Sequence, residues 1–125
     1  MPDFKDFALT YPLWILVDQS SIIKTGPGKA KFAEKIKFVV LSDATQEQSF
    51  PVFTDQDLAF RFVKKSRLKD EIISIENEQK FLEILYQVRS DASHVVFDPK
   101  KVGWTRFVWS IDYVIKVLEE RLGIG

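Results

Sequence analysis

Cysteine is absent from this 125-residue chain, and histidine occurs only once. Without cysteine there can be no disulfide bond, no thiolate ligand for a metal ion and no cysteine nucleophile. A single histidine without cysteine also argues against a zinc site, because zinc takes most of its protein ligands from these two residue types. We therefore expect no metal ion and no cofactor.

A surplus of either charge is also missing, since 18 lysine and arginine residues balance 18 aspartate and glutamate residues. Nucleic-acid-binding proteins usually carry a positive surplus, because contacts with phosphates supply much of their affinity. The balance therefore predicts no nucleic-acid partner. We interpret two local basic groups, Lys24–Lys35 and Lys64–Lys69, as solvated charge. The alternative is that the fold brings them together to bind an acidic partner or RNA.

Long hydrophobic runs are missing as well. The longest, such as Leu13–Val17, are far shorter than the roughly 20 residues that span a bilayer. The first residues, Met1–Asp6, lack the basic and then apolar regions of a signal peptide. We therefore expect a soluble cytoplasmic protein with no membrane partner. Its length predicts a single domain, residues 1–125.

Strand-like and helix-like patterns alternate along the chain. Short apolar runs predict strands at residues 13–17, 35–41, 50–53, 72–75, 94–97 and 106–109. Helical spacing predicts helices that begin at Thr54, Asn77 and Ser110, each a favourable N-cap residue, and Gly123 is predicted to end the last one. The pattern predicts an α/β (or α+β) domain with a mixed sheet of about five to six strands and about three helices packed on it.

The start of the first predicted helix is specified in most detail. Thr54 is expected to be the N-cap, with the Asp57 carboxylate reaching back to the cap amide. Phe53 and Leu58 are expected to pack together as a hydrophobic staple.

The same region carries a resemblance to a known family. The segment Phe50-Pro51-Val52-Phe53-Thr54-Asp55, then a helix, an isoleucine-rich strand and the Phe81–Leu85 helix, resembles the SseB-like N-terminal domain family. Val95–Pro99 is similar to the hydrophobic strand ending in Asn-Pro that follows in that family, with Asp98 in place of asparagine. The resemblance covers roughly residues 36–100. It implies an α/β domain and no catalytic residues.

None of the motifs with catalytic potential is complete. Gly26–Lys29 lacks the earlier glycine and the following serine or threonine of a phosphate-binding loop, so we interpret it as a turn between strands. His94 should lie about 13 Å along a strand from Asp98, which is too far for a catalytic dyad. Asp55 and Asp57 serve the start of a helix rather than a metal site. We therefore predict that the protein is not an enzyme.

The aromatic C-terminal segment carries the main functional prediction. Its candidate interface residues are Trp104, Arg106, Phe107 and Trp109, in or beside a predicted edge strand. Tryptophan and arginine are frequent in binding hot spots, and an edge strand can pair with another chain. This pattern predicts a non-catalytic protein-interaction module that binds a partner protein or a second copy of itself. The alternative is that both tryptophans simply cover the sheet.

A second hypothesis places a ligand at the ends of the strands. Thr54, Asp98 and Lys100 follow predicted strands, and ligands of α/β proteins tend to bind at the carboxyl ends of strands. These residues are the candidates for a small-molecule or anion-binding site.

Overall fold

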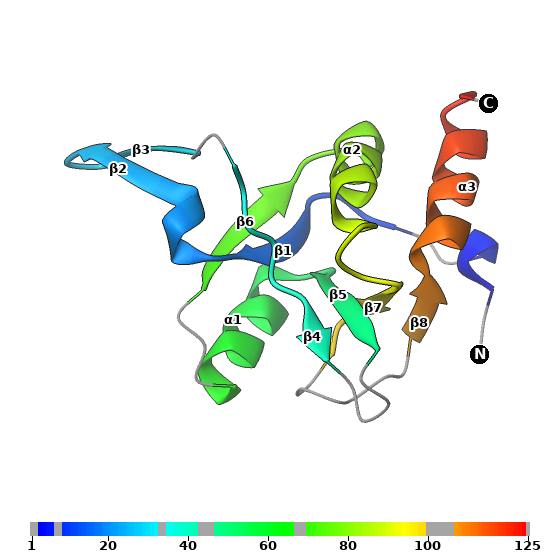
Figure 1. Ribbon diagram of the computed structural model, residues 1–125, viewed down its shortest axis with the longest axis horizontal. Helices are drawn as coiled ribbons and strands as arrows, with labels where there is room; N and C mark the ends of the chain where they lie inside the picture. The colour runs from blue at the N-terminus through cyan, green and yellow to red at the C-terminus, as the bar shows by residue number, and fades with distance from the viewer. Residues whose placement is uncertain are drawn as a thin grey trace.

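The computed structural model describes residues 3–6, 9–32, 35–42, 47–66, 70–99 and 107–124. The strands of its main sheet are β1 (Leu13–Val17), β4 (Leu41–Ser42), β5 (Gln48–Phe53), β6 (Glu71–Ile75), β7 (His94–Phe97) and β8 (Phe107–Ser110). They lie in the order β6-β1-β5-β7-β8, with β4 paired to β5 (Figure 1). Only β5 and β7 are parallel among the described pairs. The predicted α/β domain with a mixed sheet is confirmed.

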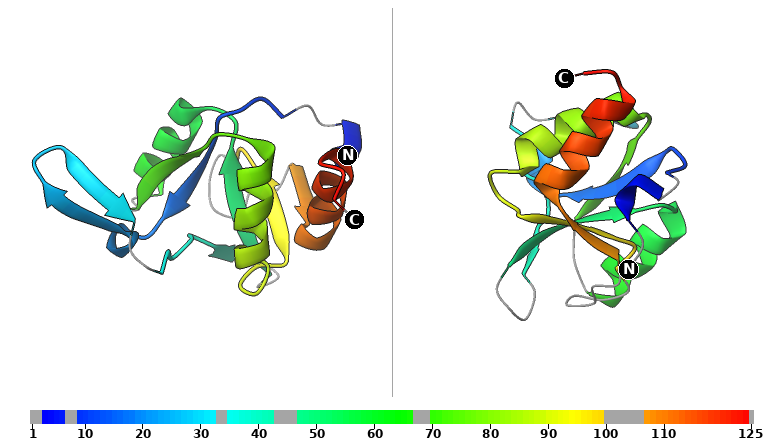
Figure 2. Two further views of the ribbon diagram at one scale, coloured as in Figure 1. Left: turned by 90° about the horizontal axis from the view of Figure 1, so that it is seen from above. Right: turned by 90° about the vertical axis from the view of Figure 1, so that its right-hand side faces the viewer.

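Three α-helices cover the two faces of this sheet within the described residues: α1 (Gln56–Lys65), α2 (Glu78–Val88) and α3 (Ile111–Arg121). The helices α2 and α3 pack side by side on one face, and α1 lies on the other (Figure 2). Asn77 and Ser110 are N-caps as predicted, since their side chains accept hydrogen bonds from the amides of Lys80 and Tyr113. Gly123 follows the end of α3 with a φ of 71°, which glycine adopts without strain.

The apolar run of β1 is explained by burial on both faces. Ile15 and Val17 belong to the cluster under α2 and α3, whereas Leu16 packs with Phe53 and Phe62 under α1. A strand that is covered on both sides reads as continuously hydrophobic instead of alternating. A short 3-10 helix, η1 (Phe4–Asp6), adds the fully buried Phe4 to the larger cluster.

Pro51 occupies a place in β5 where its missing amide hydrogen is tolerated. On one side of β5, residues 48–49 pair with β4 and residues 52–53 pair with β1. Pro51 falls between these two sets, so that side of the strand makes no ladder at this residue.

The strand predicted at residues 35–41 is wrong for most of its length. Only Leu41 lies in a strand, β4, and Phe38 makes an isolated bridge with Val17. The amide of Val39 donates to the carbonyl of Leu16 at 3.0 Å. Residues 14 and 15 of β1 already pair with β5. Only the end of β1, at Val17, is therefore left to form backbone hydrogen bonds with the segment around Phe38.

The predicted turn at Gly26–Lys29 is confirmed, and it joins two strands that form a sheet of their own. These strands are β2 (Ile22–Gly26) and β3 (Lys29–Phe32), which pair antiparallel and extend away from the rest of the molecule (Figures 1 and 2). We call this pair the β2–β3 ribbon.

Candidate functional site

Thr54 and Asp98 meet at the carboxyl ends of the parallel strands β5 and β7. The Thr54 amide donates to Asp98 Oδ1 at 2.8 Å, and the Thr54 hydroxyl donates to Asp98 Oδ2 at 2.7 Å. These bonds bring together two of the three candidate ligand-binding residues. Each carboxylate oxygen therefore accepts one hydrogen bond within the protein, and this contact joins the ends of the two strands.

Asp98 also has an unusual backbone conformation. Its φ is 49°, in the left-handed region that aspartate and asparagine enter more easily than most residues. The amide of Asp98 still donates to the carbonyl of Val52 at 2.8 Å, which extends the ladder between β7 and β5 by one residue. The conformation turns the chain at the end of β7 while its side chain holds Thr54.

The cap of α1 differs from the predicted one. Asp55, and not Thr54, is the N-cap, and its side chain accepts a hydrogen bond from the Asp57 amide at 2.7 Å. The Thr54 hydroxyl is instead directed to Asp98, to which it donates a hydrogen bond. Of the two residues predicted to form the staple, Phe53 is fully buried against Phe62, whereas Leu58 is 39% exposed.

Beside the Thr54–Asp98 contact lies a groove of about 610 Å³ along α1. We call it the α1 groove. Its described lining consists of residues from one side of α1 and from the end of β7, namely Leu58, Arg61, Phe62, Lys64, Lys65, Asp98 and Pro99. The lining combines apolar side chains with three cations and one carboxylate.

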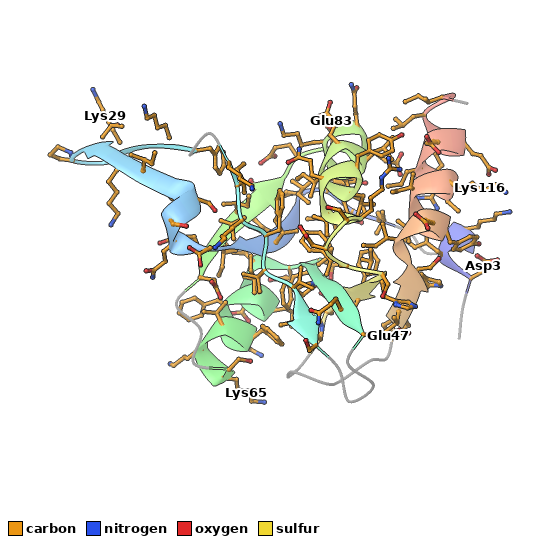
Figure 3. All side chains as sticks on the ribbon, viewed as in Figure 1. Asp3, Lys29, Glu47, Lys65, Glu83 and Lys116 are labelled. Atoms are coloured by element: carbon orange, nitrogen blue, oxygen red, sulfur yellow. The ribbon has the colours of Figure 1, made fainter. Side chains whose placement is uncertain are left out.

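The cations of the groove differ in how far they are already neutralised. Arg61 forms an ion pair with Asp57 at 2.9 Å, one turn earlier on the helix, where both side chains are largely exposed. Lys64 and Lys65 form no ion pair with any described residue. Lys65 projects from the end of α1, far from the β2–β3 ribbon (Figure 3). Two apolar side chains of the same helix are also exposed to solvent: Leu58, in the groove lining, at 39%, and Phe60, outside it, at 57%.

The aromatic segment is only partly described. Trp104, Arg106 and Lys100 lie outside the described residues. Phe107 is half-buried, and Trp109 is only 7% exposed. The Trp109 ring packs against Phe4 and Phe97, with centroids 5.2 and 5.7 Å apart.

Trp109 is therefore a core residue and is removed from the candidate interface. Its register explains this position: it pairs with Val95, which faces the cluster under α2 and α3. Among the described strands, β8 lies at the edge of the sheet, as predicted.

His94 does not form a catalytic triad with its neighbours. Its Nδ1 atom lies 2.8 Å from Ser93 Oγ and 3.1 Å from Glu47 Oε2. A Ser–His–acid triad needs the serine and the acid on opposite ring nitrogens, whereas here both contact the same one. A second hollow of about 490 Å³, next to this cluster, is lined mainly by polar residues including Ser90 and Asp91. No cluster of three or more histidine, aspartate or glutamate side chains within the described part of the chain could hold a metal ion.

The fold and groove together define an α/β domain with an apolar and basic surface beside its parallel strand ends. No protein-family model and no curated protein matches the chain. The resemblance to SseB-like domains therefore remains a prediction. Among the described helices, none combines the length and the apolar character needed to cross a membrane.

Sequence reasoning missed the groove residues on α1. Lys64 and Lys65 were interpreted as solvated charge, and their position in the last turn of α1 is also favourable for the helix dipole. The missed signal is the spacing of Leu58, Arg61 and Lys65, which repeats every three to four residues and so places cations on an apolar side of the helix.

Proposed function

We propose that the protein is a non-catalytic interaction module that binds a segment of a partner protein in the α1 groove. The observation that carries this proposal is the combination of apolar lining with two lysines that form no ion pair with a described residue. Such a surface suits a segment in which apolar side chains alternate with aspartate or glutamate. The apolar side chains supply most of the affinity, and the carboxylates orient the segment.

An exposed apolar side chain in the groove supports a protein partner. A hydrophobic side chain contributes roughly 1.5–3 kcal/mol when it becomes fully buried. Leu58 lines the groove and is 39% exposed, so a partner seated there can bury it further. Phe60 is two residues further on, lies on another side of the helix and is not part of the groove.

The aromatic C-terminal segment belongs to the same proposal. Phe97 pairs with Phe107, so the chain between them leaves and rejoins the sheet at one end. That is the end at which Asp98 and Pro99 line the α1 groove. A partner seated in the groove therefore lies beside Asp98 and Pro99, the described residues from which the chain leads on to Trp104 and Arg106. A second copy of this chain is one form that the partner could take.

The experiment compares capture of proteins from native host lysate by three forms of the tagged protein. The first is wild type, and the second is Lys64→Glu/Lys65→Glu, which reverses the charge of the groove. The third is Lys80→Glu/Lys116→Glu, which makes the same charge change on α2 and α3. Captured proteins are quantified by mass spectrometry, and sedimentation velocity reports self-association.

A partner kept by wild type and the control, but lost by the groove variant, would support the proposal. A Leu58→Ser variant should lose the same partner without any change of charge. Equal capture or equal self-association by all folded forms would show that the α1 groove is not the binding surface.

One observation favours a second candidate, an amphiphilic small-molecule anion. The groove volume of about 610 Å³ lies within the range of small-molecule sites, which are about 300–1,000 Å³. Because Thr54 and Asp98 satisfy each other, the anionic end would contact Lys64 or Lys65, and the apolar end would lie on Leu58. Titration with decanoate distinguishes the two candidates. Saturable binding that is abolished in Lys64→Glu/Lys65→Glu supports the small molecule, whereas absence of decanoate binding favours the partner protein.

A further inference from the structure

The β2–β3 ribbon is a projecting arm with a fixed base. Ser21, in the 3-10 helix η2 (Gln19–Ser21), is fully buried and accepts a hydrogen bond from the Lys37 amide at 2.8 Å. The Asp18 amide donates to the Lys37 carbonyl, also at 2.8 Å. These bonds tie the chain that enters the ribbon to the chain that leaves it. Beyond this base the ribbon extends clear of the sheet and its helices (Figure 1).

Every charged residue in the ribbon is positive. Ile22–Phe32 contains Lys24, Lys29 and Lys31 and no acidic residue. Between Asp18 and Asp43 the chain has five lysines against one glutamate, so the segment carries a local surplus in a protein of zero net charge. Lys29 projects from the end of the ribbon, away from the body of the molecule (Figure 3).

Apolar side chains are exposed between these lysines, on both faces of the ribbon. Side chains alternate between faces, and paired residues share a face. Lys24 and Phe32 therefore lie on one face, while Ile23 and Lys31 lie on the other. Phe32 is 53% exposed and Ile23 is 42% exposed. A membrane surface needs all the apolar side chains on one face, which this ribbon does not provide.

We propose that the β2–β3 ribbon binds nucleic acid, with its lysines on the phosphates and Phe32 against a base. A two-stranded ribbon has the width of the DNA major groove, and a base can stack on an exposed aromatic ring in a single strand. Lysines on exposed strands also protect against pairing with other chains. That protection does not account for the exposed Phe32 beside the lysines.

The binding experiment uses fluorescence anisotropy with labelled 20-nucleotide probes, one single-stranded and one duplex. With three lysine–phosphate contacts, the slope of log affinity against log salt should be about −2 to −3. Affinity should therefore fall by about 20- to 40-fold between 50 and 200 mM salt. Absence of binding to both probes at 50 mM salt would overturn the proposal.

Matched variants locate the contact. Lys29→Ala/Lys31→Ala should reduce the magnitude of the slope by about 1.4–1.8, because two of the three phosphate contacts are lost. Lys29→Arg/Lys31→Arg should retain binding. Lys80→Ala/Lys116→Ala removes the same charge elsewhere and should bind like wild type. An equal loss in this control would overturn the proposal, because binding would then depend on total charge.

Two further comparisons identify the anion. Phe32→Ala should weaken binding of the single strand more than binding of the duplex, because only unpaired bases can stack on the ring. Polyglutamate is the competitor that represents an acidic protein. If it displaces the probes at equal charge concentration, the ribbon recognises negative charge in general and the nucleic-acid proposal is wrong.

Discussion

Replacing Asp98 by alanine should destabilise the protein strongly, because two effects add. The variant loses two hydrogen bonds from Thr54 to a carboxylate, at 2.8 and 2.7 Å in a partly buried place. Hydrogen bonds to charged groups contribute about 1.5–3 kcal/mol each, and two bonds between one pair of residues should together contribute about 2–4 kcal/mol. Alanine must also adopt the φ of 49°, at a cost of about 1–2 kcal/mol.

The free energy of unfolding should therefore fall by about 3–6 kcal/mol in Asp98→Ala, measured by urea denaturation. Asp98→Gly loses the same bonds but adopts a positive φ freely, so it should be about 1 kcal/mol more stable than Asp98→Ala. Asp98→Asn keeps an acceptor oxygen and tolerates this φ, and should lose only about 1–2 kcal/mol. Thr54→Val, which removes the hydroxyl alone, should lose a similar amount.

The order of these variants is the informative result. Asp98→Ala should be the least stable variant, Asp98→Gly should be intermediate, and Asp98→Asn should be nearest to wild type. If Asp98→Ala loses less than about 1 kcal/mol, the two bonds to Thr54 contribute no more than an ordinary surface contact. If Asp98→Ala and Asp98→Gly have the same free energy of unfolding, the backbone conformation at residue 98 is not strained, and that part of the reasoning fails.

Three further changes test other parts of the structure. Trp109→Ala should lower the free energy of unfolding by about 3–5 kcal/mol because it leaves a cavity in the core, while Phe60→Ala on the surface should change it by less than about 0.5 kcal/mol. Asp55→Ala should lose about 1 kcal/mol as an N-cap, and no loss would show that another residue caps α1. Burial and the nearby Asp18 carboxylate raise the pKa of Asp70, so its ionised form destabilises the folded state. Asp70→Asn should therefore raise the melting temperature at pH 7, and the gain should disappear below about pH 4, where aspartate is protonated in both folded and unfolded states.

Local sequence patterns predicted the helices well, and the N-cap of α1 shows the limit of what such patterns can predict. Thr54 and Asp55 are adjacent and both suit an N-cap, so local chemistry cannot choose between them. The choice is made by Asp98, 44 residues further along the chain, which binds the Thr54 hydroxyl. A cap therefore becomes predictable only when the neighbouring strand is known.

The position of Trp109 depended on strand register in the same way. Aromatic content is compatible with either a core or an interface, because aromatic side chains are common in both. Pairing of Trp109 with Val95 directs its ring to the face that α2 and α3 cover. A shift of one residue in this pairing would have placed the ring on the opposite face. The sequence of β8 alone does not contain that information.

The charge of the chain shows why a sum over residues says little about local binding surfaces. The prediction of no nucleic-acid partner rested on equal numbers of acidic and basic residues. A ligand responds to the local field, however, and exposed charges are largely screened beyond about 8 Å at physiological salt. Lys29 lies on a ribbon that extends from the body, and Lys65 lies at the end of α1 in another part of the molecule (Figure 3). Ile22–Phe32 itself contains no acidic residue to cancel its lysines, so zero net charge remains compatible with a basic binding surface.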